Sequence, residues 1–153
     1  MKQDARIYCA VGAVVFRGAD VLLVRRGRPP LQGHWSIPGG KIGYGELLEE
    51  AVCREVREET GVEIEIAGLI DVFEALPEKD GDGHYVLIDF VARWVSGEVR
   101  AADDADEAEF VPFPEALSRL AWDKTRTALQ QARLALKKAD AKKAEVTMRG
   151  PAA

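Results

Sequence analysis

Residues 40–62 read GKIGYGELLEEAVCREVREETGV, and this stretch decides the fold. From Gly45 to Thr60 it is rich in Glu, Leu, Ala and Arg and has no Gly or Pro after its first residue, a composition that predicts a helix. Gly61 follows directly and suits the left-handed position that commonly closes a helix. We expect one apolar stripe of this helix to pack against a sheet. The stripe consists of Leu48, Ala51 and Val52.

The apolar stripe turns acidic toward the C-terminal end of this helix. Glu55 lies in line with the stripe, and Glu58 and Glu59 flank it. Like charges one turn apart repel each other, and the negative end of the helix dipole disfavours acids further, so the group needs a cation. One alternative is an exposed lattice of salt bridges in which Arg54 pairs with Glu58. Three clustered carboxylates match a hard divalent cation better, which favours a site for Mg²⁺ or Mn²⁺.

The segment ahead of the helix is rich in glycine, with Gly39, Gly40, Gly43 and Gly45 around Lys41. Without a Cβ atom, backbone groups come close to a ligand or a metal. A glycine-rich loop is a weak signal by itself. Here it leads into a helix that carries clustered acids, and the combination indicates a binding site.

Strand-like runs lie on both sides of the helix. Ile7–Phe16 and Val21–Val24 are β-branched and aliphatic, and the Gly and Asp between them suit a tight turn, so we expect a hairpin. Residues 26–40 are rich in Gly and Pro and are expected to form a loop. Ile64–Phe73 and Tyr85–Val95 predict a second hairpin with a long connection.

The last third of the chain should be mainly helical. Residues 98–109 are acidic and small, as in an exposed loop, and the next two residues suit a short strand. Pro114 fits the first turn of a helix, and Trp122–Lys138 predict the final helix. The order of elements predicts an α/β fold in which a mixed sheet carries helices on its faces. We expect one domain, residues 1–138, followed by a flexible tail, residues 139–153.

The overall composition restricts the function. The chain has 153 residues and a net charge of −5, which argues against broad binding to nucleic acid. No apolar run approaches the ~20 residues of a membrane-spanning helix, and no secretory signal is visible, so we expect a cytoplasmic protein that binds no membrane. Cys9 and Cys53 predict neither a disulfide nor a zinc site. The net charge is still compatible with small anionic substrates. The local positive charge that they need comes from Arg25, Arg26, Arg28 and Lys41.

The stretch from Gly40 to Val62 resembles the Nudix box, whose pattern is Gly-x5-Glu-x7-Arg-Glu-aliphatic-x-Glu-Glu-x-Gly-aliphatic. Every spacing is kept. The matching positions are Gly40, Glu46, Arg54, Glu55, Val56, Glu58, Glu59, Gly61 and Val62. The similarity extends over residues 7–136, so the resemblance implies the Nudix α/β/α sandwich with a mixed sheet and a catalytic helix. It also implies a hydrolase that uses Mg²⁺, with Mn²⁺ as a substitute.

The resemblance carries roles onto positions of this chain. The carbonyl of Gly39 and the carboxylates of Glu58 and Glu59 match metal ligands of the family. Glu55 matches an acid that either binds the metal or activates water, depending on the family member. Arg54 matches the residue that orients these acids, and together with the three glutamates it forms the catalytic set.

Two acids outside the helix also have counterparts in the family. Glu46 matches a residue that braces the loop against the helix. The family commonly supplies one further metal-binding acid from a loop before a late strand, and Asp104 occupies the corresponding place. Its neighbours Asp103, Asp106 and Glu107 are competing candidates.

The activity implied by the resemblance is hydrolysis of the diphosphate bond in a nucleoside diphosphate linked to another group. Pro77, in the loop after Gly61, resembles the ADP-ribose pyrophosphatase subgroup and favours ADP-ribose or a nucleotide sugar, with release of a nucleoside monophosphate. The short length and the Gly-Gly-Lys lead-in resemble MutT-type enzymes, which hydrolyse nucleoside triphosphates, including oxidised ones. A nucleotide-binding sensor without activity and a plain interaction module are further alternatives, which the intact acids disfavour.

The residues that would hold the nucleotide lie mostly outside the box. Arg26 and Lys41 supply positive charge, and Trp35 supplies an aromatic face. His84 is a candidate to form a hydrogen bond with a phosphate. Phe73 and Tyr85 are further stacking candidates, although such residues more often belong to a core. The predicted partner is therefore a small-molecule nucleotide. The oligomeric state is open, with a homodimer as one alternative.

Overall fold

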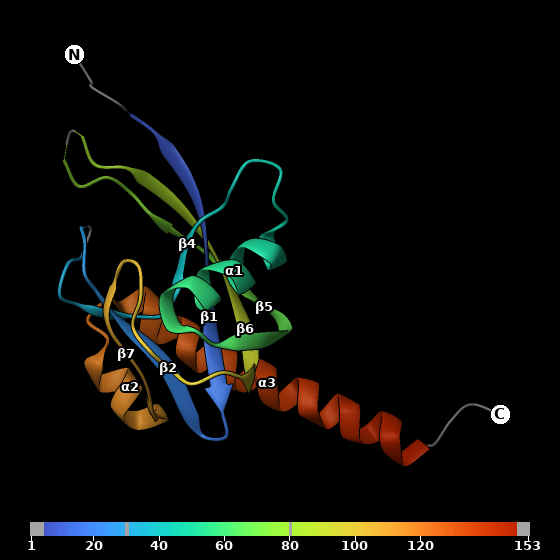
Figure 1. The fold of residues 1–153 in the computed structure, drawn as a ribbon. Helices are drawn as coiled ribbons and strands as arrows, with labels where there is room; N and C mark the ends of the chain where they lie inside the picture. The colour runs from blue at the N-terminus through green and yellow to red at the C-terminus, as the bar shows by residue number, and fades with distance from the viewer. Residues whose placement is uncertain (1–4, 30, 80, 150–153) are drawn as a thin grey trace.

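The computed structural model describes residues 5–29, 31–79 and 81–149. One helix lies on one face of a central sheet, and the long final helix crosses the other face (Figure 1). In chain order the elements are β1 (Ile7–Arg17), β2 (Asp20–Arg26), β3 (Trp35–Ser36), β4 (Gly39–Lys41), α1 (Leu48–Thr60), β5 (Glu63–Ala75), β6 (His84–Ser96), β7 (Ala105–Pro112), α2 (Phe113–Arg119) and α3 (Asp123–Arg149).

The strands form one mixed sheet of seven strands. Its main order is β3-β2-β1-β6-β5, with β4 beside β1 and β7 beside β2. The central strands β1 and β6 run parallel, and every other pairing is antiparallel. The two parallel strands are nearly continuous apolar runs, as a strand covered on both faces requires. The predicted α/β fold with a mixed sheet is confirmed.

Alternate residues of the central strands pack into two separate hydrophobic cores, because successive side chains point to opposite faces of the sheet. On the α1 face, Ala13 and Val15 of β1 pack with Val52 of α1. On the α3 face, Val14 of β1 packs with Leu129 of α3. The predicted stripe of α1 is largely correct, because Ala51 and Val52 are fully buried. Leu48 is 36% exposed because it is the first residue of the helix.

The helix that carries the box is bounded at both ends by a left-handed glycine. Gly45 has a φ of 78°, a conformation that no α-helix contains, so α1 begins at Leu48 and the predicted start at Gly45 is wrong. Gly61 has a φ of 73°, and its N–H donates to the carbonyl of Arg57 at 2.9 Å. The predicted end of the helix is therefore confirmed.

Three further boundaries differ from those predicted, and in each case tertiary contacts or length explain the difference. Residues 26–40 contain β3 and part of β4, which pair with β2 and β1. β7 begins at Ala105 because it pairs with β2 along its length, so the acidic segment before Phe110 is only partly a loop. α3 continues to Arg149, so the predicted helix end at Lys138 is wrong.

The C-terminal half of α3 projects beyond the sheet (Figure 1). The flexibility of the tail and the domain boundary at residue 138 stay predictions, and residues 150–153 lie outside the described ranges. Within those ranges, none of the helices has the length and apolar character needed to cross a membrane.

Candidate active site

The glycine-rich loop passes so close to β1 and α1 that side chains would not fit. A Cβ atom on Gly39 would lie 2.1 Å from the carbonyl oxygen of Val11. A Cβ atom on Gly40 would lie 2.5 Å from the carboxyl group of Glu55. The two glycines thus place a bare stretch of backbone directly against the acidic side of α1.

Arg54 is the hub that ties this loop to the helix. Its guanidinium donates to both carboxylate oxygens of Glu46, at 2.7 and 2.9 Å, to Glu55 at 2.9 Å and to Glu58 at 3.1 Å. It also donates to the carbonyl of Lys41 at 3.3 Å. Hydrogen bonds from Arg54 and from the Gly43 N–H lower the pKa of Glu46 to about 2, so this acid is a permanent anion that braces the loop.

Glu59 is the most enclosed acid of the helix. The residue is 8% exposed, and its carboxylate accepts a hydrogen bond from the Gly39 N–H at 3.3 Å. Burial raises the pKa of Glu59 to about 8, and the nearby charge of Glu55 adds to this, while the Gly39 N–H and Arg26 oppose it. Burial also raises the pKa of Glu55, against the effect of Arg54. Both carboxylates are therefore held where negative charge is unfavourable unless a cation accompanies it.

The segment after β6 folds over the C-terminal end of α1. The N–H groups of Arg100 and Ala102 donate to the carbonyls of Thr60 and Glu59, each at 3.0 Å, and so satisfy acceptors that a helix end leaves open. This contact brings Asp103 and Asp104 to the acids of the box. The charge of Asp103 raises the pKa of Glu55.

Asp104, the acid predicted to complete the site, lies near Glu59. Its charge raises the pKa of Glu59, so the two carboxylates are electrostatic neighbours. Its side chain pairs with Arg28 at 3.1 Å, and its carbonyl accepts the N–H of Gly27 at 2.7 Å. Asp103 shares the neighbourhood and has a φ of 52°, a left-handed conformation uncommon for a residue with a side chain.

The acids surround one region but do not converge on one point. No group of three or more His, Cys, Asp or Glu side chains in the described ranges is arranged to hold a metal ion. Arg54 accounts for this, because it holds the carboxylates of both Glu55 and Glu58. The side chain of Glu58 is 44% exposed, more than its place beside the apolar stripe predicts.

The four residues predicted to bind the nucleotide are dispersed. Arg26, at the end of β2, lies close enough to Glu59 to lower its pKa. The ammonium of Lys41 lies 4.0 Å from the ring centre of Tyr8. The ring of Trp35 is covered by the guanidinium of Arg119 at 4.8 Å and packs against the core of the α3 face.

The other three aromatic candidates lie on the neighbouring strands β5 and β6. His84 opens β6 beside Ile7, and its Nε2 atom is enclosed without a hydrogen-bond partner in the described ranges. Tyr85 stacks on Tyr8 with 5.1 Å between ring centres. Phe73 of β5 pairs in register with Leu87 of β6.

One buried acid was missed by the sequence analysis. Asp89 lies in the middle of β6 and is 7% exposed. A single Asp inside the apolar run from Tyr85 to Val95 is the signal that indicates it, because a charged residue is rarely fully buried without a partner.

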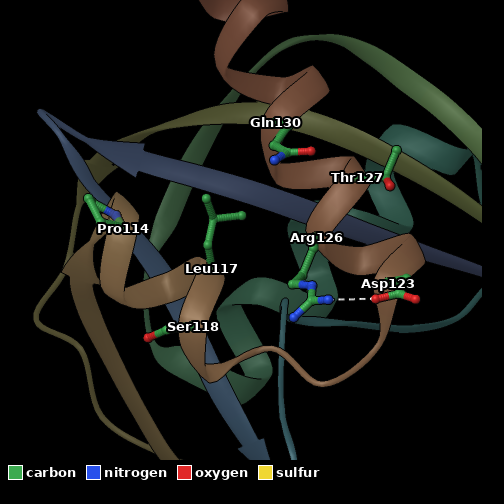
Figure 2. A pocket seen from close by; sticks show the side chains of 7 residues that line it. All are labelled: Pro114, Leu117, Ser118, Asp123, Arg126, Thr127 and Gln130. Carbon is green, nitrogen blue, oxygen red and sulfur yellow. Dashed lines mark hydrogen bonds and ion pairs between the residues drawn. The ribbon is translucent and has the colours of Figure 1, made fainter.

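A surface hollow between α2 and α3 lies outside the box (Figure 2). An ion pair between Arg126 and Asp123, at 2.6 Å, crosses part of it. Its lining consists of Pro114, Leu117, Ser118, Asp123, Arg126, Thr127 and Gln130. None of the residues predicted for the site contributes to this lining.

The fold and the site together define a class: an α/β domain in which a glycine-rich loop and an acid-bearing helix meet beside a mixed sheet. A family model described as the NUDIX domain matches residues 8–132, so the chain belongs to the NUDIX family of hydrolases.

Individual relatives show how far the similarity extends. The chain is 39% identical over 114 residues to an ADP-ribose pyrophosphatase of Methanocaldococcus jannaschii, covering 74% of this chain and 66% of the relative. It is 37% identical over 99 residues to a putative 8-oxo-dGTP diphosphatase 2 of Mycobacterium tuberculosis, covering 61% of this chain and 65% of the relative. The chain thus spans slightly less than two thirds of the length of these two relatives.

A solved structure shares both the fold and part of the sequence. The MutT NUDIX hydrolase from Burkholderia pseudomallei is 34% identical and superposes with a TM-score of 0.70. The match covers 82% of this chain and 98% of that one.

Proposed function

We propose that this protein is a Mg²⁺-dependent pyrophosphohydrolase that splits the diphosphate bond of ADP-ribose or a nucleotide sugar. The observation that carries the proposal is the buried carboxylate of Glu59 against the Gly39 N–H, with Glu55 enclosed beside Gly40. Charged oxygen ligands enclosed next to exposed backbone are what a site for a hard cation and a diphosphate needs.

The donor set fits a divalent cation. Glu59 accepts one hydrogen bond from the described residues although a carboxylate has about four acceptor positions, so most of its lone pairs remain for a cation. Glu55, Glu58, the carbonyl of Gly39 and Asp104 would complete an all-oxygen set of the kind Mg²⁺ prefers. A bound divalent cation supplies charge that screens the phosphates and lowers the pKa of water.

In this proposal Arg54 and Glu46 position the acids of the site. Arg54 donates hydrogen bonds to Glu55 and Glu58, the two carboxylates that would turn toward a bound cation. Glu46 keeps two hydrogen bonds to Arg54 and thereby holds the guanidinium beside the site. The positive charge of Arg26 near Glu59 would attract the diphosphate.

The reaction then requires one proton acceptor. The oxygen of water forms a bond to one phosphorus, and the bond from that phosphorus to the bridging oxygen breaks. Glu55 or Glu59 accepts the proton of the attacking water, which is the general-base role that an enclosed carboxylate suits. The products are a nucleoside monophosphate and the phosphorylated remainder.

Two substrate classes compete. The relative from Methanocaldococcus jannaschii is named an ADP-ribose pyrophosphatase, and this name supports ADP-ribose. The relative from Mycobacterium tuberculosis is named a putative 8-oxo-dGTP diphosphatase, and it supports a MutT-type activity on nucleoside triphosphates as the second candidate. The two activities leave different products, since ADP-ribose yields ribose 5-phosphate and a triphosphate yields pyrophosphate.

A product assay tests both candidates. The purified chain is incubated with Mg²⁺ and, separately, with ADP-ribose, nucleotide sugars, dinucleotides and nucleoside triphosphates including 8-oxo-dGTP. We expect the highest kcat/KM with ADP-ribose, with AMP and ribose 5-phosphate formed in equal amounts and activity lost in EDTA. Pyrophosphate release from triphosphates at a higher kcat/KM would assign the MutT-type activity instead.

Substitution of one glutamate tests the site. Glu59→Gln should lower kcat/KM by about 10²–10⁴-fold, because the amide neither binds a cation strongly nor accepts a proton. Glu49→Gln is the matched control, since Glu49 lies exposed on the same helix and should leave the activity unchanged. If the two variants are equally active, the assignment of the site is wrong.

A further inference from the structure

Asp89 is a buried acid that the proposed hydrolysis does not use. It is 7% exposed and forms no hydrogen bond or ion pair with any residue that the structure describes. A carboxyl group withdrawn from water without a hydrogen-bond partner carries a substantial cost in folding free energy. An acid kept at such a cost calls for a ligand that supplies the missing partner.

The carboxyl group of Asp89 lies directly over a glycine of the neighbouring strand. In the sheet it lies opposite Gly12, where a Cβ atom would lie 2.7 Å from Asp89 Oδ1 and 3.1 Å from Ile37 Cδ1. The glycine therefore gives the carboxyl group its room. The residue keeps 7% of its surface exposed, so the strand and its neighbours do not seal it completely.

The distance between Asp89 and the box is similar to the length of a nucleoside. Gly39, Gly12 and Asp89 are consecutive partners across β4, β1 and β6, so Gly39 and Asp89 are two strands, or about 10 Å, apart. A ribose bridges a gap of this order between a diphosphate and its base. Lys41 pairs with Ala10, two residues from Gly12, and therefore points to the same face of the sheet.

This face opens where the apolar cluster under α3 ends. Val91 lies two residues beyond Asp89 and packs with Leu129 and Ala132 of α3. Toward the start of β6 the same face carries the stacked rings of Tyr85 and Tyr8. Asp89 is therefore the polar residue between a closed core and an aromatic surface.

We propose that Asp89 is a specificity-determining residue that hydrogen-bonds the N1 and N6 edge of adenine in the substrate. The inference rests on the proposed function, because it takes the diphosphate to lie at the box. Adenine offers an acceptor at N1 beside a donor at N6, and a neutral carboxylic acid offers a donor beside an acceptor. The two edges are complementary, whereas a purine without the N6 amino group offers only the N1 acceptor.

The environment keeps the acid in the form that this pairing needs. Burial raises the pKa of Asp89 to about 7, and it is the sole cause of the shift. Gly12 and Ile37 are uncharged, and the register partner on β5, Asp71, is exposed to solvent. A protonated carboxyl group is therefore well populated near neutral pH.

A binding experiment on the full chain tests this proposal without hydrolysis. Isothermal titration calorimetry with Mg²⁺ present compares AMP with purine riboside 5′-monophosphate, which lacks the amino group. We expect the wild-type protein to bind AMP about 10-fold more tightly, as one buried hydrogen bond to the amino group suggests. Asp89→Leu should abolish this preference, so that the two dissociation constants become similar.

Two further variants separate recognition from folding. Asp89→Asn should keep the preference for AMP, because an amide also offers a donor beside an acceptor. Gly12→Ala should reduce it, because the new methyl group displaces the carboxyl group. Asp89→Leu should melt at a higher temperature than the wild type, since an unpartnered buried acid is removed.

The outcomes distinguish this inference from the proposed function. Hydrolysis of ADP-ribose together with an AMP preference that survives Asp89→Leu would overturn the role of Asp89 and leave the function standing. Failure of the wild-type protein to bind AMP more tightly than purine riboside 5′-monophosphate would also overturn it.

Discussion

Glu59 on α1 and Asp89 on β6 are both buried carboxyl groups, yet the two faces of the sheet surround them differently. Glu59 accepts an N–H from Gly39, has the charge of Arg26 nearby, and has Glu55 and Asp104 as acidic neighbours. Asp89 has none of these, and burial alone raises its pKa to about 7. A cluster of acids with backbone at hand suits a cation, whereas a solitary acid in an apolar wall suits a neutral hydrogen-bond partner.

The Arg54 hub makes the acids of the α1 face interdependent, so its removal should lower both activity and stability. Arg54→Met would leave Glu46, Glu55 and Glu58 without their shared partner. We expect kcat/KM to fall about 10–100-fold, as for other groups that hold metal ligands in place. The free energy of unfolding should fall by about 2 kcal/mol, a modest figure because the Arg54 side chain is 31% exposed.

Urea unfolding with and without Mg²⁺ measures the effect of Arg54→Met on stability. Mg²⁺ should stabilise the variant more than the wild type, because the cation then offsets acids that have lost their guanidinium. Arg57→Met is the control on the same helix, since its partner Glu63 is exposed and the loss should be small. Equal stability of the Arg54 and Arg57 variants would mean that the hub does not organise this face.

The pH dependence of stability should isolate the acid of the α3 face. The folded-state pKa of Asp89, about 7, lies above its ordinary value of 3.8, so the folded state binds more protons between these pH values. The free energy of unfolding therefore decreases as the pH rises through this window. The contribution of Asp89 to it is fully present below pH 3.8. Asp89→Asn removes this loss. The variant should lie close to the wild type near pH 4 and exceed it by about 4 kcal/mol at pH 8.

Thermal or urea unfolding at pH 4, 6 and 8 checks the Asp89 prediction. The difference between variant and wild type is the informative quantity, because the titration of Glu59 and of other acids is common to both proteins. A constant difference across the three pH values would show that Asp89 keeps an ordinary pKa in the folded protein.

The two faces were not equally predictable from the sequence. The box lies within one helix and the loop before it, so the period of 3.6 residues and the glycine spacing place Arg54 and its acids without knowledge of the rest of the fold. Asp89 and Gly12 meet only because β1 and β6 run parallel side by side, although they lie far apart in the sequence. Pairing of this kind is long-range, and no local pattern in either strand reports it.

The same limit explains the remaining errors in the predicted fold. β3 and β4 are too short to have a period of their own and exist because β2 and β1 offer them partners. β7 is longer than predicted because its acidic half pairs with the arginine-rich end of β2, where Arg25 and Glu107 form an ion pair at 3.2 Å. Asp103 and Asp104 reach the box through backbone bonds to the end of α1, which spacing alone does not reveal.

Deletion of the projecting part of α3 should have the smallest effect on either face. The buried residues of this helix are Thr125, Ala128, Leu129 and Ala132, all before Lys138. Beyond it, Val146 is 63% and Met148 is 89% exposed, and an ion pair to the sheet, from Arg93 to Asp140, lies at the surface. A chain that ends at Lys138 should therefore keep its activity and lose less than about 1 kcal/mol of stability.

Urea unfolding and size-exclusion chromatography of the shortened chain check this boundary. A stability loss that depends on protein concentration, together with a smaller particle than the full-length chain, would show that the projecting half of α3 packs against a second copy. In that case the exposed Val146 and Met148 would belong to an interface, and the domain would extend past residue 138. An unchanged particle size and midpoint would instead leave α3 with one role, which is to cover the face that carries Asp89.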